Sequence, residues 1–170
     1  MKYTHYLYIM FFFVVAGPLL SGCNNEDDVM EIFTGKMWKL SYIAAEGTRI
    51  QFNYWPNDNA NGEAYQHSME LLRKADNFTI TFTGGEINNV ISGTFSGKGS
   101  NATLNGQWKA NGESQSLSMN TNVSGRETDP LARAFVNGLQ NVIRYEGDAM
   151  NLFIYFKDGE TVKYMGLKPQ

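Results

Sequence analysis

The chain has 170 residues and a formal net charge of −3, from 14 lysines and arginines against 17 aspartates and glutamates. This weakly negative balance, without a basic stripe, argues against a nucleic acid partner, because binding to a phosphate backbone requires clustered cations. With a single cysteine the chain forms no internal disulfide, so its stability must come from apolar burial.

Residues 1–22 have the layout of a secretory signal peptide. Lys2 precedes an apolar run, and small residues follow it before Cys23. The run is shorter than the roughly 20 apolar residues that a membrane-spanning helix needs. The stretch Leu20-Ser21-Gly22-Cys23 resembles the lipobox of bacterial lipoproteins, which implies cleavage before Cys23 and acylation of that cysteine. The alternative is an ordinary signal peptide that ends near an accidental cysteine.

Residues 23–31 are predicted to form an acidic, lipid-anchored tether, because Asn24-Asn25-Glu26-Asp27-Asp28 has too little apolar surface to fold alone. An acidic stretch after the cysteine also resembles the surface-export signal of Bacteroidota lipoproteins. The resemblance implies an outer membrane lipoprotein that is exposed at the cell surface or faces the periplasm. Its membrane contact would be the lipid on Cys23. Residues 32–170 have a length typical of a single domain.

The first predicted strand covers residues 32–43. Period-two alternation places Trp38, Leu40 and Tyr42 on one face of it. A second strand is predicted around residues 49–54.

Residues 55–62 are rich in asparagine and predict a polar loop. Aromatic side chains on such a loop can stack on sugars or peptides, so Tyr54 and Trp55 are the candidate contacts to a ligand or partner. The alternative is that Trp55 folds back onto the end of the sheet. A short helix is predicted over residues 63–75. It contains His67, the one histidine after the signal peptide, for which we expect a solvated side chain.

Residues 77–83 alternate apolar residues with threonine and predict the clearest strand of the chain. Short strands broken by glycine and asparagine follow at 90–95, 102–108 and 116–119. Such close spacing predicts an antiparallel meander.

The hydrophobic period changes at residues 129–143, which predict a helix with Asp129 as its N-cap and Pro130 in its first turn. Its apolar stripe consists of Leu131, Ala134, Phe135, Leu139 and Val142. Apolar runs at 152–156 and 161–165 flank an Asp-Gly pair, which predicts a hairpin. Together the elements predict an α+β fold that is mainly antiparallel β: a curved sheet or partial barrel of about eight strands packed by one helix.

This order of elements resembles the META domain of a bacterial heat-shock envelope protein and of many small lipoproteins. The resemblance spans residues 33–167 and rests on Trp38-Lys39-Leu40, Ile91-Ser92-Gly93, Gly106-Gln107-Trp108 and Leu131-Ala132-Arg133-Ala134-Phe135. The chain has Gly99-Ser100-Asn101 where that family often has a cysteine, so the resemblance implies a divergent member without a disulfide. The alternative fold is a lipocalin-like β-barrel, which Gly35 and Trp38 suggest.

Catalytic motifs are missing from the sequence, and we expect neither a metal nor a cofactor. Carboxylate pairs can hydrolyse glycosides when they face each other across a cleft. Two pairs lie close in sequence, Glu146 with Asp148 and Asp158 with Glu160, but both fall in predicted turns. A glycoside hydrolase is therefore only a remote alternative.

The predicted function is that of a non-catalytic, monomeric envelope or cell-surface lipoprotein that binds an envelope protein or a glycan, or supports envelope integrity. The alternative is a small-ligand carrier with an apolar pocket inside a barrel. A solid scaffold would instead fill the space between sheet and helix with large side chains. The candidates are Trp38, Phe82, Trp108, Phe135 and Phe153.

Overall fold

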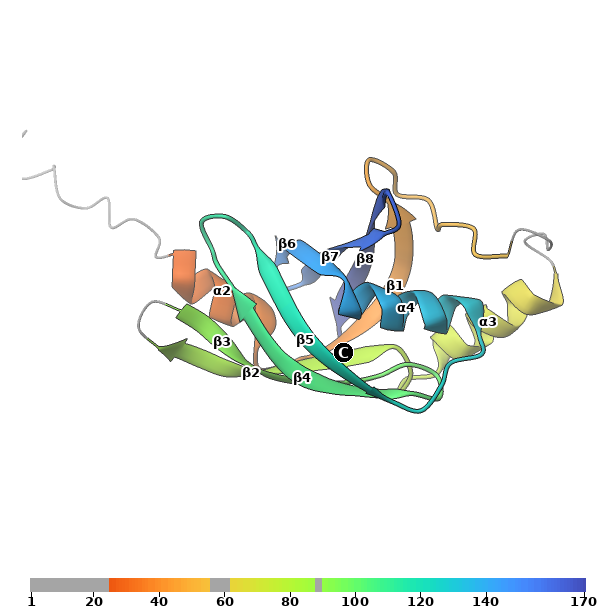
Figure 1. Ribbon diagram of the computed structural model, residues 1–170, viewed down its shortest axis with the longest axis horizontal. Coiled ribbons are helices and arrows are strands. Elements are labelled where there is room, and N and C mark those ends of the chain that lie inside the picture. The colour runs from red at the N-terminus through yellow and green to blue at the C-terminus, as the bar shows by residue number, and fades with distance from the viewer. Residues whose placement is uncertain (1–24, 56–61, 88–89) are drawn as a thin grey trace, which may run out of the picture.

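The structure, a computed structural model, describes residues 25–55, 62–87 and 90–170 (Figure 1). The predicted signal peptide and Cys23 lie outside these residues. The described part contains the helices α2 (Asn25–Phe33), α3 (Glu63–Arg73) and α4 (Pro130–Gln140). Its strands are β1 (Met37–Ala45), β2 (Thr79–Ile87), β3 (Val90–Lys98), β4 (Thr103–Ala110), β5 (Leu117–Ser124), β6 (Val142–Asp148), β7 (Asn151–Asp158) and β8 (Thr161–Pro169).

The eight strands form one sheet in the order β5-β4-β3-β2-β1-β8-β7-β6, and every neighbouring pair is antiparallel. The first and last strands therefore lie side by side in the middle of the sheet. The sheet curves until its two edge strands approach at one end, where the Tyr145 amide donates to the Gln115 carbonyl at 3.0 Å. The predicted fold class, a curved and mainly antiparallel sheet of about eight strands, is confirmed.

Helix α4 crosses the gap between the edge strands β5 and β6 (Figure 1). The Asp129 side chain caps it by accepting a hydrogen bond from the Ala132 amide at 2.9 Å, as predicted. Gly138 allows the helix to approach the sheet closely, because a Cβ there would lie 2.0 Å from Met165 Cε. The helix ends at Gln140, earlier than the predicted residue 143, and the β-branched pair Val142-Ile143 starts β6 instead.

Aromatic side chains fill the inner side of the sheet. The Phe33 ring centroid lies 4.9 Å from those of Phe82, Trp108 and Tyr145. Of the five predicted core residues, four are buried: Trp38, Phe82, Trp108 and Phe135. The prediction is wrong for Phe153, which lies on the outer face of β7. The buried rings occupy space in which an interior-pocket carrier would hold its ligand.

The N-terminal segment differs from the tether that the sequence predicted. Residues 25–33 form α2, whose Val29 and Phe33 are 2% and 0% exposed. Val29, Ile32 and Phe33 recur at helical spacing, as in an amphipathic helix. The acidic residues at the start of this helix favour the prediction of a solvated tether instead. The core therefore begins before residue 32.

The predicted strand over residues 49–54 is also wrong. Only Gln51 forms a bridge, with Ala44 of β1. Strand β1 pairs with β2 over Met37–Lys39 alone. The C-terminal part of β1 is therefore free on that edge to form the bridge between Ala44 and Gln51. The remaining predicted strands and the helix over 63–75 are confirmed, with shifted ends.

Candidate functional site

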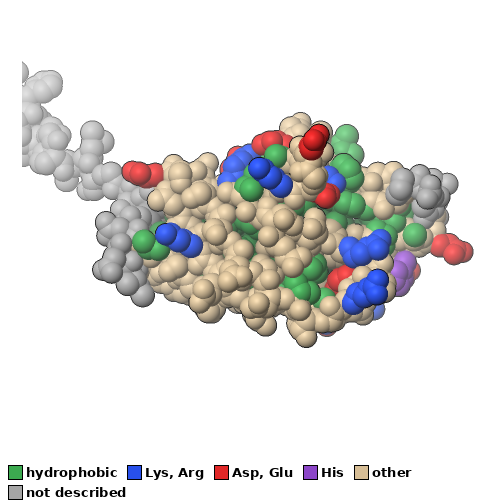
Figure 2. Space-filling model, viewed as in Figure 1, with side chains coloured by type: hydrophobic (Ala, Val, Ile, Leu, Met, Phe, Trp, Pro, Cys, Tyr) green, Lys and Arg blue, Asp and Glu red, His purple; other side chains and the backbone are tan. Residues whose placement is uncertain are grey.

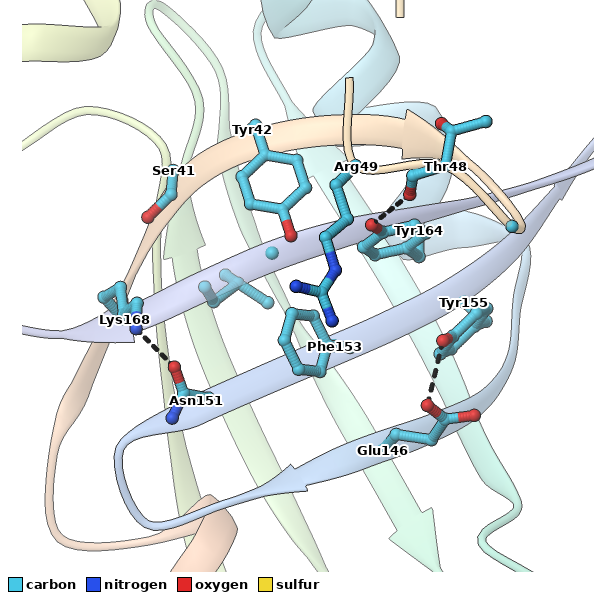
Figure 3. Close-up of a pocket in the computed structure, with 13 residues that line it drawn as sticks. Ser41, Tyr42, Thr48, Arg49, Glu146, Asn151, Phe153, Tyr155, Tyr164 and Lys168 are labelled. Atoms are coloured by element: carbon cyan, nitrogen blue, oxygen red, sulfur yellow. Dashed lines mark hydrogen bonds between the residues drawn. The ribbon is translucent and has the colours of Figure 1, made fainter. Parts of the chain in front are cut away.

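A pocket of about 570 Å³ lies on the outer face of the sheet, over β1, β8 and β7 (Figure 3). We call it the outer-face pocket. Its aromatic lining consists of Tyr42, Phe153, Tyr155 and Tyr164. Its polar lining includes Ser41, Arg49, Glu146, Asn151 and Lys168.

The hollow is centred on a glycine in β8. Gly166 pairs with Tyr42 of β1 on one side and with Phe153 of β7 on the other. Because Gly166 has no side chain, Tyr42 leans across it: a Cβ at this position would lie 2.6 Å from Tyr42 Cε1. Any larger residue at position 166 would displace this ring and narrow the pocket.

A β-bulge supplies the pocket wall on β1. The register shifts between Leu40 and Tyr42, which leaves Ser41 as an extra residue. A bulge re-aims the side chains around it. Leu40 faces the core, whereas both Ser41 and Tyr42 line the outer-face pocket. The prediction that Tyr42 shares a face with Trp38 and Leu40 is therefore wrong.

Tyr164 is the centre of the aromatic cluster. Its ring centroid lies 5.8 Å from those of Tyr42 and Phe153, and 5.3 Å from that of Tyr155. Its hydroxyl donates to the Thr48 carbonyl at 2.5 Å, which fastens the loop after β1 beside the pocket. Burial, with help from the neighbouring Tyr42, raises the pKa of Tyr164 to about 12. The hydroxyl is therefore a proton donor at neutral pH.

A charged network borders the pocket on the β6 side. The Arg144 guanidinium stacks over the Tyr155 ring at 3.4 Å and pairs with Glu46 at 2.7 Å and with Glu146. The Tyr155 hydroxyl donates to Glu146 at 2.9 Å (Figure 3). A second bulge, between Val142 and Arg144, places Arg144 directly opposite Tyr155. Arg144 thus balances the charge of Glu146, and the contacts with Arg144 and Tyr155 hold the carboxylate in place.

Two further cations, Arg49 and Lys168, line the pocket without forming an ion pair with a described carboxylate. Arg49 is exposed on the loop after β1, and its guanidinium points into the pocket beside Phe153 (Figure 3). Among the described residues, no carboxylate lies within ion-pair distance of Arg49 or Lys168. Lys168 donates instead to the neutral Asn151 side chain.

A second hollow, of about 470 Å³, lies over β3, β4 and β5. Most of its lining is uncharged, from residues such as Ser92, Thr94, Gln107 and Asn120, with Lys109 as a charged member. Figure 2 shows that the surface over β4 and β5 is mostly tan, the colour of backbone and uncharged polar side chains. The ring in its lining, Trp108, is buried, and Lys109 is its one charged group, so this hollow has neither the exposed rings nor the several charged groups of the outer-face pocket.

The predicted contact residues lie elsewhere and are not displayed on an exposed loop. Trp55 is 4% exposed, and its Nε1 donates to Ser68 Oγ at 3.0 Å. Trp55 thus folds back onto the domain. The Tyr54 hydroxyl is buried without a hydrogen-bond partner among the described residues, and burial, followed by the charge of Asp158, raises the pKa of Tyr54. The residues of the outer-face pocket are not among the contact residues that the sequence predicts.

The remaining candidates have local structural roles. His67 is exposed on α3. Glu146 pairs with Arg144, while Asp148 accepts hydrogen bonds from the amides of Met150 and Asn151. Asp158 pairs with Lys163, and Glu160 is exposed in the following turn.

Within residues 25–55, 62–87 and 90–170, His, Cys, Asp and Glu do not gather in threes as a metal site would require. In the same ranges each helix is too short or too polar to cross a bilayer.

A family model described as "Domain of unknown function (DUF4847)" matches residues 24–169. A crystal structure of a DUF4847 family protein from Bacteroides vulgatus is similar at 26% identity and a TM-score of 0.56, covering 82% of this chain and 96% of that one. No curated protein matches the chain. The resemblance to the META domain is therefore wrong: the order of a meander, a helix and a hairpin does not by itself specify a family, and the family that matches is DUF4847.

Proposed function

The chain belongs to the DUF4847 family, and we propose that it is a non-catalytic binding domain of the cell envelope that holds a small polar ligand in its outer-face pocket. The outer-face pocket is the observation that carries this proposal. It combines aromatic rings, hydrogen-bonding groups and a cation without a carboxylate in one hollow on a rigid sheet. Small-molecule sites have this composition and volumes of roughly 300–1,000 Å³.

The exposed rings support a binding role on energetic grounds. Tyr42, Phe153 and Tyr155 remain only partly buried, although the same sheet buries most of its other large apolar residues. Each square ångström of apolar surface left in water forgoes roughly 25 cal/mol. A ligand that covers these rings recovers part of this energy.

The pocket is also organised before any ligand arrives. The rings pack against Tyr164, whose hydroxyl is bonded to Thr48, and Arg144 holds Tyr155 and Glu146 together. A ligand therefore loses little free energy to ordering these side chains. Because Glu146 is tied to Arg144 and Tyr155, this carboxylate is suited to hydrogen bonding rather than to acid–base catalysis.

The envelope location rests on the sequence around Cys23. In the sequence, only Asn24 separates Cys23 from the first residue of α2, so a lipid on Cys23 would keep the domain close to the membrane. Metabolic labelling with an alkyne fatty acid tests this step. We expect label on the wild type and its loss in Cys23→Ala, and an unlabelled wild type would contradict the lipid anchor. Protease treatment of intact cells then separates surface exposure, which predicts cleavage, from periplasmic orientation, which predicts protection.

Ligand binding is tested on the purified protein by thermal shift against a library of saccharides, amino acids and small organic acids. We expect at least one saturable stabilisation. It should disappear in Phe153→Ala, which removes part of the aromatic lining, and weaken in Gly166→Ala. Gly85→Ala is the matched control, because a Cβ at Gly85 meets nothing within 4 Å. Stabilisation that survives Phe153→Ala would contradict the proposed site.

A further inference from the structure

The charges around the outer-face pocket are distributed unevenly. On the β6 side, Arg144 already has two carboxylate partners, Glu46 and Glu146. On the other side, Arg49 and Lys168 have none among the described residues. The nearby Asp148 carboxylate accepts hydrogen bonds from the amides of its own turn, and the charge of Lys168 helps to lower its pKa, so Lys168 is partly balanced. Arg49 is therefore the cation that the pocket offers most freely to an incoming negative group, in a chain whose overall charge is −3.

Arg49 is the better placed of the two cations. Its guanidinium points toward the middle of the pocket, above Phe153 and beside Tyr164 (Figure 3). A planar guanidinium binds a carboxylate with two parallel hydrogen bonds. Its position next to the rings allows one ligand to touch the aromatic surface and the cation together.

The aromatic lining fits the face of a sugar ring. The faces of Tyr and Phe rings carry partial negative charge and attract polarised C–H groups, which sugars display on one side. Around the rings lie the Ser41 hydroxyl, the Asn151 amide and the Glu146 carboxylate, which can bond the hydroxyl groups at a sugar's rim. A purely apolar ligand would cover these polar groups without satisfying them, at a cost in free energy.

These observations lead to one ligand class. We propose that the outer-face pocket binds an acidic oligosaccharide, with a uronic acid ring against Phe153 and Tyr42 and its carboxylate bound by Arg49. The volume of about 570 Å³ leaves room for more than one sugar ring. This inference rests on the proposed binding function and specifies its ligand.

The test uses calorimetric titration of the purified protein with three probes of similar length. They are uronic acid trisaccharides (galacturonate, glucuronate and mannuronate forms), their methyl esters, and triglutamate as an acidic peptide. We expect one uronate to bind, its ester to bind at least tenfold more weakly, and triglutamate not to bind. Arg49→Gln should weaken the uronate about tenfold without affecting the ester. The exposed Arg133→Gln on α4 is the matched control and should leave both unchanged.

The outcomes separate the two proposals. Equal affinity for acid and ester, or binding of triglutamate as tight as that of the uronates, would overturn the acidic sugar while leaving a binding pocket. Failure of all three uronates to bind, with another compound still recognised in a Phe153-dependent way, would do the same. Loss of uronate binding in Arg49→Gln but not in Arg133→Gln or Phe153→Ala would place the carboxylate at Arg49 but remove the ring contact from the proposal.

Discussion

Glu127 Oε1 accepts a hydrogen bond of 2.8 Å from the backbone amide of Ser100, in the turn between β3 and β4. The same oxygen accepts from the amides of Asn101 and Ala102 at 2.9 and 2.8 Å, and the Ser100 hydroxyl donates to Oε2 at 2.5 Å. One carboxylate thus satisfies three consecutive amides of the turn. Because Glu127 lies two residues before Asp129, the N-cap of α4, these hydrogen bonds connect the start of the helix to the turn between β3 and β4.

Removal of this carboxylate should destabilise the domain strongly. In Glu127→Ala the three amides lose their acceptor, and we expect the free energy of unfolding to fall by about 3 kcal/mol. Urea denaturation of the purified protein measures the change. Glu86→Ala, at an exposed position of β2, is the control and should alter the value by less than about 0.5 kcal/mol. Equal effects of the two substitutions would show that the turn does not depend on Glu127.

The same residue should make stability dependent on pH in acid. Burial opposes ionisation of Glu127, but the hydrogen bonds from Ser100 and from the amides of Ala102 and Asn101 outweigh it and lower the pKa. The unfolded chain then binds the proton more readily than the folded one. The contribution of Glu127 to the free energy of unfolding is fully present above the ordinary glutamate pKa. It is lost as the pH falls through the lowered pKa of the folded state. Glu127→Gln should flatten this acid slope in urea titrations between pH 6 and 3, and an unchanged slope would contradict the assignment.

The sequence predicts most of the fold because its patterns are clear where one face of a strand is polar. In β2 and β4, threonine, asparagine and glutamine alternate with Phe82 and Trp108, which fixes the buried face. Residues 152–156 are all apolar or aromatic, so either face could point inward. The structure buries Leu152, Ile154 and Phe156 and leaves Phe153 and Tyr155 outside.

The outer-face pocket escaped prediction for the same reason. The sequence predicts Phe153 in the core, and the bulge at Ser41, which turns Tyr42 to the outer face, has no marker in the sequence. Arg49 lies in a segment predicted as a strand. Gly166 is the one local signal of the pocket in the sequence, because a glycine inside a strand often marks a position that another group approaches closely. Assembly of the pocket depends on the pairing of β1 with β8, more than 100 residues apart in the sequence.

The buried contact between α3 and α4 should also tolerate little change. Ser68 is fully buried; its hydroxyl donates to Asp129 Oδ2 at 2.5 Å and accepts from Trp55 Nε1 at 3.0 Å. Ser68→Ala leaves Trp55 Nε1 without its acceptor and Asp129 Oδ2 without its donor inside the protein, and we expect a loss of about 2–4 kcal/mol in the free energy of unfolding. Ser118→Ala, exposed on β5, should be nearly neutral. If guanidinium denaturation gives the same midpoint for both variants, the buried network does not contribute to stability.

The ion pair between Lys163 and Asp158 should respond asymmetrically to substitution. Lys163 is 5% exposed, with its ammonium 2.6 Å from Asp158 and 3.4 Å from the centre of the Phe52 ring. The Asp158 side chain is 37% exposed and can be solvated alone.

Asp158→Asn should therefore cost about 2–3 kcal/mol, because it leaves a buried cation without a carboxylate, whereas Lys163→Met preserves volume and should cost under about 1 kcal/mol. In the double variant the asparagine adds little further loss, since the cation is gone. Urea denaturation of the four proteins gives this double-mutant cycle. Additive effects, or a larger loss for Lys163→Met than for Asp158→Asn, would show that the buried ammonium does not need Asp158 and that the Phe52 and Tyr54 rings are sufficient partners.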